Sequence, residues 1–361
     1  MRLIHRDATT GLLKLRLETP SDLWRLARIV RPGDRVGSST TRRDPEAPED
    51  VPGAQRERRR VWLVIQVEQV EFHDFSGHVR LTGPIVEGPF DIGRHHTLDL
   101  STGDDLTLLK EEVTAADRAL LDEGLDNRNE PVLVVACVDW GESSIVRVHG
   151  RAIQTVADVN RTISGKQFKG GQGEKDRAQY VAELVRLLGP EVKDAAGLVI
   201  AGPGFLKEEL ARALLEAEPA AKAKLKVYPT SGSGRIGIDE LLRSGRASEA
   251  LAGSVTATES DLVERLMQAL AGGRRAAVGP VEVREAMDQG AVETLLVGEA
   301  ALRTPEVLPI LDEARSQRAH VLVVGKDGEA GRRLHGLGDI AALLRYDWSP
   351  VAGRRGRAPA S

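Results

Sequence analysis

The sequence predicts a multi-domain α+β protein in which a small β-barrel is followed by two α/β units. Several short runs rich in β-branched residues, bounded by Gly, Pro or Asp, fill the first part of the chain and are typical of a barrel. From residue 131 onward, apolar runs alternate with helical patterns, which indicates α/β structure. A length of 361 residues suits two or three domains of about 100–200 residues. We expect domains at residues 1–130, 131–254 and 255–352, and a basic disordered tail at 353–361.

The first unit is expected to contain four strands and one helix. The helix is expected at residues 21–30, because Ser21 can cap it and apolar residues follow at helical spacing. Residues 42–60 hold three prolines, five acids and six arginines without apolar periodicity, so they are predicted to form an exposed, mobile loop between two strands. The strands are expected at residues 12–17, 61–70, 78–82 and 97–100.

The second and third units are expected to alternate strands with helices. The run VLVVACV at residues 132–138 is typical of a strand buried on both faces. The other strands of the second unit are expected at residues 145–148, 197–201 and 225–228, with helices at 176–188 and 206–218. In the third unit, helices are expected at 260–271, 281–289 and 310–318, and strands at 277–278, 294–297 and 320–324.

Composition excludes several classes of protein. The net charge of −4 excludes a uniformly basic nucleic-acid coat, so any RNA contact must be local. The single cysteine, Cys137, excludes an intramolecular disulfide and a zinc finger, and its apolar strand makes it inert. No apolar run approaches the ~18 residues of a membrane helix, and the first residues lack the core of a secretory signal. We expect a soluble, cytoplasmic monomer with no membrane partner.

The densest local charge is the segment QRERRR, which ends the predicted loop at residue 60. Arginine pairs bidentately with phosphate, and each such contact releases counterions. Two interpretations stay open: a loop that contacts RNA, or a solvated, charged hairpin tip.

A divalent-metal site in the first unit is a further hypothesis. Neighbouring histidines on a strand point to opposite faces, so His95 and His96 are not expected to share one ion. No pair of donors has a diagnostic spacing, so the metal ligands stay unknown, and roles in turns or at strand ends are the alternative. The possible donors are Asp7, Asp22, His73, Asp74, His95 and His96.

Three glycine-containing segments carry further candidates. Residues 165–173 read GKQFKGGQG, and Gly-Gly-Gln is the tripeptide with which class-1 release factors position water on the peptidyl ester. Gln172 is therefore the one candidate catalytic residue, and a glycine loop that contacts tRNA or nothing is the alternative. Residues 231–237 (SGSGRIG) lack the Gly-Lys-Ser/Thr end of a P-loop and are expected to connect to a helix. The Pro-Gly-Phe turn at 203–205 opens a helix, and its phenylalanine either packs locally or contacts a partner.

Seven segments together resemble the pelota family, in particular its archaeal members, over roughly residues 1–347. They occur in the family's order and at about its spacing, and no single one is decisive. The segments are residues 21–43 (SDLWRLARIVRPGDRVGSSTTRR), 67–81 (VEQVEFHDFSGHVRL), 85–98 (IVEGPFDIGRHHTL), 200–205 (IAGPGF), 230–242 (TSGSGRIGIDELL), 281–298 (VEVREAMDQGAVETLLVG) and 334–345 (LHGLGDIAALLR).

The resemblance implies an Sm-like β-barrel followed by two α/β domains of release-factor type. It implies a ribosome-rescue factor in no-go and non-stop mRNA surveillance, which binds mRNA and the A site of stalled ribosomes. Its implied partners are an elongation-factor-like GTPase and an ABC-type ATPase that splits the subunits. The implied main role is non-catalytic and requires no cofactor. A divalent-metal-dependent endoribonuclease activity, contested among archaeal relatives, is the first alternative.

The resemblance also carries over to individual residues. It implies RNA contacts for Arg42, Arg43, Arg56, Arg58, Arg59 and Arg60 at the mRNA channel, and for Lys166, Lys169, Lys175 and Arg177 near the tRNA site. It implies partner contacts for Pro203, Gly204 and Phe205. One departure stands out: pelota proteins typically lack the tripeptide found here as Gly170-Gly171-Gln172. Peptidyl-tRNA hydrolysis through this tripeptide is the second alternative.

Overall fold

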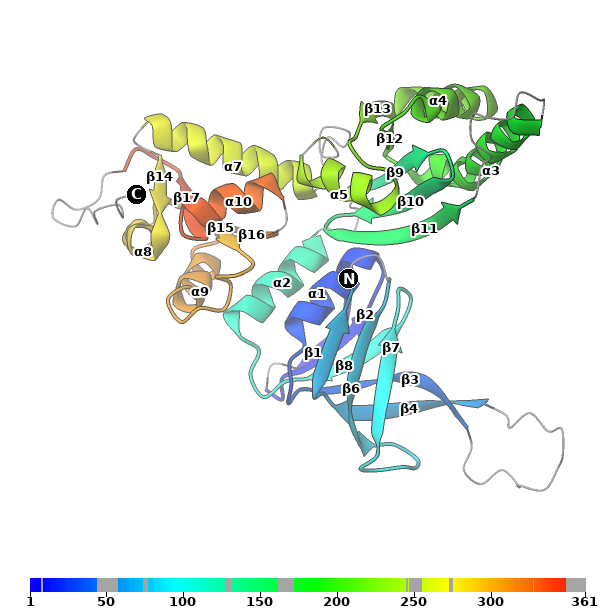
Figure 1. Cartoon of the computed structure of the whole chain (residues 1–361). Helices are drawn as coiled ribbons and strands as arrows, with labels where there is room; N and C mark the ends of the chain where they lie inside the picture. The colour runs from blue at the N-terminus through cyan, green and yellow to red at the C-terminus, as the bar shows by residue number, and fades with distance from the viewer. Residues whose placement is uncertain are drawn as a thin grey trace, which may run out of the picture. The chain divides into compact units, whose positions relative to one another are not determined.

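The computed structural model, shown in Figure 1, clusters into two compact units. The first unit is formed by Met1–Val113, Leu120–Glu130 and Val146–Val156. The second is formed by Thr114–Ala119, Pro131–Ile145 and Ala157–Ser361. The residues that the structure describes are 1–7, 9–43, 58–73, 77–126, 131–161, 172–244, 246, 255–272, 275–326 and 328–348.

The first unit contains an antiparallel eight-stranded sheet. Its order is β1-β2-β8-β3-β4-β6-β5, and β7 pairs with β6. Leucine, isoleucine and valine alternate with polar residues along these strands and form one buried face. The strands are β1 (Arg2–Asp7), β2 (Leu12–Arg16), β3 (Arg35–Arg43), β4 (Arg58–Gln66), β5 (Gln69–Phe72), β6 (Val79–Glu87), β7 (His95–Leu100) and β8 (Asp105–Leu109).

Helix α1 (Pro20–Ile29) packs against this sheet, as its β5 and β6 contacts show. Its N-cap is Thr19 rather than the expected Ser21. The carboxylate of Asp22, in the first turn, accepts the backbone N–H of Thr19 at 2.9 Å, which holds the start of the helix. Ser21 instead donates its hydroxyl to the carbonyl oxygen of His149.

Several predictions for the first unit are wrong in detail. The single strand expected at residues 61–70 is two strands, β4 and β5, because the chain changes partner at Val67, whose N–H binds the carbonyl of Asp34. The ends of the predicted loop at 42–60 are strand residues of β3 and β4. A second helix, α2 (Ala115–Asp126), and the strands β1, β3 and β8 were not predicted.

Two further sheets follow along the chain, of which the first has the order β11-β10-β9-β12-β13. Strands β9, β12 and β13 are parallel. The strands expected at 132–138, 145–148, 197–201 and 225–228 and the helix expected at 206–218 are confirmed, with ends that differ by up to three residues. Helix α3 starts four residues earlier than the predicted residue 176. It also ends later than the predicted residue 188, because it continues through Pro190. The elements are β9 (Val132–Asp139), β10 (Glu142–His149), β11 (Ala152–Asn160), α3 (Gln172–Asp194), β12 (Gly197–Gly202), α4 (Leu206–Ala217), the 3-10 helix η1 (Pro219–Ala223), β13 (Leu225–Pro229) and α5 (Gly234–Arg243).

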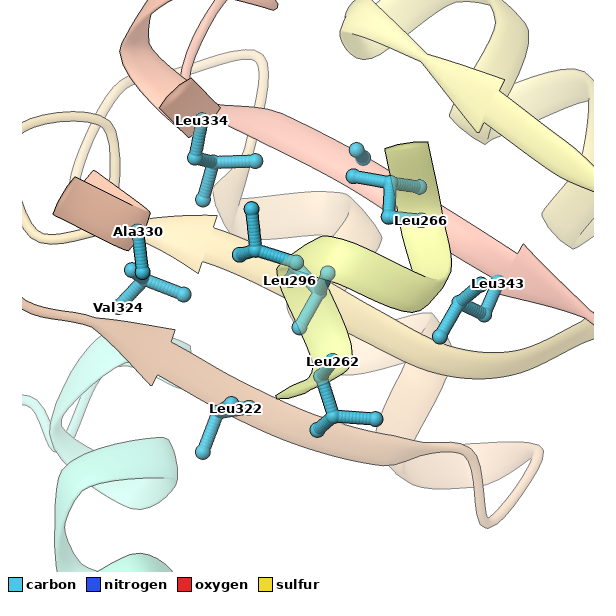
Figure 2. Packing of buried hydrophobic residues seen from close by; sticks show 10 residues of the cluster. Leu262, Leu266, Leu296, Leu322, Val324, Ala330, Leu334 and Leu343 are labelled. Carbon is cyan, nitrogen blue, oxygen red and sulfur yellow. The ribbon is translucent and has the colours of Figure 1, made fainter. Parts of the chain in front are cut away.

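The other sheet has the order β14-β17-β15-β16 and combines parallel and antiparallel pairs. Figure 2 shows leucines from α7 packed against leucines of β15, β16 and β17. Burying each leucine contributes roughly 1.5–3 kcal/mol, so this cluster holds α7 on the sheet. The elements are α7 (Val255–Gly272), β14 (Ala276–Val278), α8 (Gly279–Asp288), β15 (Val292–Gly298), α9 (Leu308–Ser316), β16 (His320–Val324), α10 (Glu329–Gly336) and β17 (Ile340–Leu344). Among the described residues, none of the helices combines the length and the apolar character that a membrane crossing requires.

Candidate nucleic-acid interface

The β3–β4 ladder brings arginines opposite one another. Its pairing runs from Arg35 opposite Gln66 out to Arg43 opposite Arg58, and it places Arg42 opposite Arg59 and Thr41 opposite Arg60. Beyond Ser38, β3 no longer pairs with β8, so the outer part of the ladder is a two-stranded arm, visible in Figure 1. Like charges directly opposite each other destabilise a ladder. Anions that bind this end would relieve that repulsion.

The structure therefore brings together five of the six predicted arginines. Arg42, Arg43, Arg58 and Arg59 lie in the ladder by backbone register, and Arg60 is exposed. Arg56 lies outside the described residues. Whether these arginines contact RNA stays a prediction.

The basic residues predicted in the second unit lie at the start of α3. Lys175 and Arg177 are exposed on its first turns, whereas Lys166 and Lys169 lie outside the described residues. The guanidinium of Arg177 lies over the indole of Trp140, with its carbon 5.0 Å from the ring centroid. This cation–π contact orients the arginine at the turn between β9 and β10. No local sequence pattern points to Trp140, because its contact joins a turn to a helix that lies far along the chain.

Gln172 is the first residue of α3, and Gly170 and Gly171 lie outside the described residues. The helix therefore begins within the tripeptide, four residues before the expected start at Asp176. The backbone position of Gln172 is a helix N-terminus. Its proposed catalytic role is not tested by this placement.

The Pro-Gly-Phe turn lies between β12 and α4. Phe205 is 88% exposed, which rules out the interpretation that it packs locally. The ammonium of Lys207 donates to the carbonyl of Gly204 at 2.5 Å and holds the turn in place. An exposed phenylalanine on a fixed turn is available to an apolar pocket of a partner. Ile236, on α5, is also 74% exposed and was not predicted.

The segment SGSGRIG does not offer its donors to phosphate. Glu240 accepts the backbone N–H of Ser231 at 2.8 Å, and Glu142 accepts the hydroxyl of Ser233 at 2.9 Å. Two carboxylates at the start of α5 would repel a phosphate group. Residues 231–233 connect to α5 as expected, but the helix begins at Gly234, within the segment rather than after it. Burial raises the pKa of the nearby Cys137 thiol, which keeps it protonated.

The donors considered for a metal ion do not converge. His95 lies 2.9 Å from the carboxylate of Glu68, and His96 lies 3.2 Å from the hydroxyl of Thr40 on another strand. Asp7 accepts hydrogen bonds from Thr10 and Thr9, which lower the pKa of its carboxyl. Asp22 caps α1, and Asp74 lies outside the described residues. Over the described ranges, no group of three or more His, Cys, Asp or Glu side chains could hold a metal ion.

Comparison with known domains defines the class of protein. Residues 1–125 match the Pelota N-terminal domain, residues 132–253 match eRF1 domain 2, and residues 256–348 match eRF1 domain 3. The chain is therefore a three-domain protein related to translation release factors, which confirms the expected fold class.

The relatives identify the family within that class. The chain is 35% identical over 348 residues to a protein pelota homolog of Methanothrix thermoacetophila, covering 96% of this chain and 98% of the relative. It is 34% identical over 353 residues to the homolog of Methanosarcina barkeri, covering 96% and 99%. The crystal structure of the Thermoplasma acidophilum Pelota protein matches with a TM-score of 0.57 at 21% identity, covering 96% of this chain and all (100%) of that one, and shows the same fold. The chain belongs to the pelota family.

Proposed function

We propose that this chain is a ribosome-rescue factor that binds the A site of stalled ribosomes and promotes dissociation of the subunits. The observation that carries the proposal is the arginine-faced end of the β3–β4 ladder, in a chain that matches a pelota homolog over 96% of its length. Binding by shape and charge requires no cofactor, and it suits a protein of the cytoplasm, where ribosomes work.

The facing arginines of the β3–β4 ladder would be stabilised by a bound anion. Register places Arg42 and Arg43 opposite Arg59 and Arg58, so like charges are opposite one another at this end. The phosphates of an mRNA supply the missing charge, and each contact releases counterions into solution. We therefore assign mRNA contact to the six arginines of the arm, with Arg56 placed by sequence alone.

The second unit supplies the other contacts in this proposal. Lys175 and Arg177, with Lys166 and Lys169, are assigned to RNA near the tRNA site. Pro203, Gly204 and Phe205 are assigned to an elongation-factor-like GTPase, because Phe205 is exposed on a fixed turn. An ABC-type ATPase then separates the subunits, and the process serves no-go and non-stop decay.

The two alternatives differ in what supports them. Metal-dependent cleavage of mRNA has no support from the donor set, because His95 contacts Glu68 and His96 contacts Thr40, which are separate partners. Peptidyl-tRNA hydrolysis keeps one candidate, Gln172.

The test is a stalled ribosome complex mixed with the purified chain, its GTPase and the splitting ATPase. Subunit separation, peptide release and the ends of the mRNA are scored in one reaction. We expect separation without cleavage, and we expect Arg60→Ala to reduce it. Arg94→Ala is the matched control, because it removes one exposed arginine from the same unit outside the arm. Unchanged separation with Arg60→Ala, and with all six arginines replaced, would contradict the proposal.

Peptide release separates the second alternative. If the parent chain releases peptide and the Gln172→Ala variant does not, hydrolysis of peptidyl-tRNA through Gln172 is established. Equal peptide release by both would remove Gln172 from consideration.

A further inference from the structure

The outer face of the sheet in the first unit exposes a tryptophan. Along β4, Leu63 and Ile65 point into the core, so Trp62 points to the opposite face. Trp62 is 43% exposed, whereas Trp24 and Trp348 are only 4% and 6% exposed. An indole with this exposure leaves part of its aromatic face open to a ligand.

Glycine at position 37 allows the indole to lie across the sheet. Ser39 is opposite Trp62, and Gly37 is the diagonal neighbour on β3. A Cβ atom at Gly37 would lie 3.0 Å from Nε1 of Trp62 and 2.6 Å from the hydroxyl oxygen of Thr107. Both distances are shorter than ordinary contacts, so a larger residue at position 37 would require the side chains of Thr107 and Trp62 to shift. The indole is therefore held at a defined place, with part of it open to solvent.

The face that carries the indole holds hydroxyls, a valine and charges of both signs. Val64 follows Trp62 by two residues on β4, and the exposed Glu87 is opposite Val64. Ser39 and Thr107 lie beside it, and Thr41 is opposite Arg60, two residues along β4 and about 7 Å from Trp62. Lys14 is exposed on the same face, but it lies on β2, three strands and so about 14 Å or more from Trp62. The carboxylate of Asp105, on the same face, is already paired with Arg16 at 3.2 Å. In the described part of the chain, the indole N–H of Trp62 has no hydrogen-bond partner.

We propose that Trp62 is a stacking platform for an unpaired base of single-stranded RNA. An aromatic face offers stacking to any base, and surrounding cations hold the phosphates, which is the general design of single-strand binding. Arg60 and the arginines beyond it in the ladder supply those cations, and the hydroxyls of Ser39 and Thr41 can bind sugar or base edges. The proposal rests on the proposed function only in taking the RNA to be mRNA. It extends the interface from the arginine arm onto the sheet.

Continuity with the arginines of the β3–β4 ladder favours RNA over a protein as the occupant, because Trp62 is two residues from Arg60 and the register continues to Arg59 and Arg58. A protein surface would need acidic groups to meet this row of arginines, whereas RNA carries a negative charge at every nucleotide. The open indole N–H also suits an oxygen-rich ligand. A protein partner or a second copy of this chain is therefore an outcome of the test that would overturn the proposal.

The test measures binding of a labelled ten-residue oligouridine to the full chain. Trp62→Thr keeps a strand-forming residue but removes the ring, and Trp62→Tyr keeps a ring. We expect the dissociation constant to rise about 5- to 100-fold with threonine and to stay near the parent value with tyrosine. The slope of log affinity against log salt is expected to stay unchanged with threonine, because no phosphate contact is lost. Ile92→Ala, at another exposed apolar side chain of the same unit, is the matched control.

Fluorescence provides a direct readout of the ring. In a Trp140→Phe background, Trp62 is the exposed tryptophan, since Trp24 and Trp348 are buried. We expect oligouridine to quench this emission. Equal affinity of Trp62→Thr and the parent, or no quenching, would overturn the proposal. So would self-association of the parent that Trp62→Thr abolishes.

Failure of this proposal can be told apart from failure of the proposed function. If the Trp62→Thr chain binds RNA normally and the parent chain separates the subunits of stalled ribosomes, only the stacking proposal fails. If the parent chain binds oligouridine through Trp62 but does not separate ribosomal subunits, only the proposed rescue function fails.

Discussion

Arginines in two regions of the first unit have opposite environments. Between α1 and α2, Arg25 is 2% exposed and donates to the carboxylate of Glu123 at 3.2 Å. Glu123 also accepts from Arg151 at 2.5 Å, and Asp22 lies 3.6 Å from Arg25. In the outer part of the β3–β4 ladder, by contrast, arginines are opposite arginines.

The difference separates arginines that stabilise the fold from arginines available to a ligand. A buried guanidinium has to be paired with carboxylates, because an uncompensated buried charge is very costly. An exposed arginine at a strand end faces no such requirement, and a row of them weakens the ladder slightly. Arginines that the register places opposite one another are best explained by a binding partner that is an anion.

The largest effect is expected from removing a partner in the buried network. Glu123→Ala leaves Arg25 and Arg151 without their shared carboxylate, and we expect unfolding free energy to fall by about 3–5 kcal/mol. Urea denaturation followed by circular dichroism measures this loss. Glu112→Ala, at an exposed carboxylate, is the control and should change stability by less than about 0.5 kcal/mol. Equal stability of the two variants would contradict the comparison.

In the arm, we expect substitution of arginines to weaken binding rather than stability. Replacing Arg56, Arg58, Arg59 and Arg60 by alanine should weaken ribosome binding at least tenfold, or by about 1.4 kcal/mol. The slope of log affinity against log salt should fall by about 0.7 for each lost phosphate contact. Binding is measured by pelleting ribosomes at several salt concentrations. We expect the unfolding free energy to stay unchanged or to rise slightly, and a large loss of stability would show that the arginines are structural.

A single charge reversal tests both properties of the arm together. Arg59→Glu places a carboxylate opposite Arg42, and we expect the ladder to gain about 0.2–1 kcal/mol while ribosome binding weakens. Arg59→Ala is the matched control, which removes the repulsion without adding an attraction. Thermal unfolding and ribosome pelleting should therefore change in opposite directions. A change in the same direction would show that fold and binding depend on the same contacts.

The smallest effect is expected for a pair of intermediate exposure in the second unit. Burial tends to raise the pKa of Asp158, but hydrogen bonds from Arg235 and Ser144, both at 2.7 Å, outweigh it, so the pKa is lowered. A carboxyl with a lowered folded-state pKa stabilises the fold above its unfolded value of about 3.9, and this contribution is lost as pH falls through the folded value. Arg235→Gln should therefore cost less than about 1 kcal/mol at pH 7, because the pair is partly exposed. Urea denaturation at pH 7 and below pH 4 should show the difference shrinking with acid; a constant difference would contradict it.

The elements predicted well share one physical property. Strands β9, β12 and β16 are apolar runs buried largely on both faces, and α4 has regular helical spacing, so local sequence is enough to reveal them. Strand β1 was missed because it is mostly exposed, with no alternating apolar residues to reveal it. Among candidate residues, the exposure of Phe205 settled a choice that the sequence left open.

By itself, the sequence determined the order of the domains, the family, the buried strands and the concentration of arginine near residue 60. Each of these follows from residues that are neighbours in the chain. The tertiary structure decided which arginines are opposite one another, that Glu123 compensates Arg25, and that Gly37 leaves room for Trp62. Strand register and helix packing join residues far apart in the chain, and their energies depend on the whole folded unit.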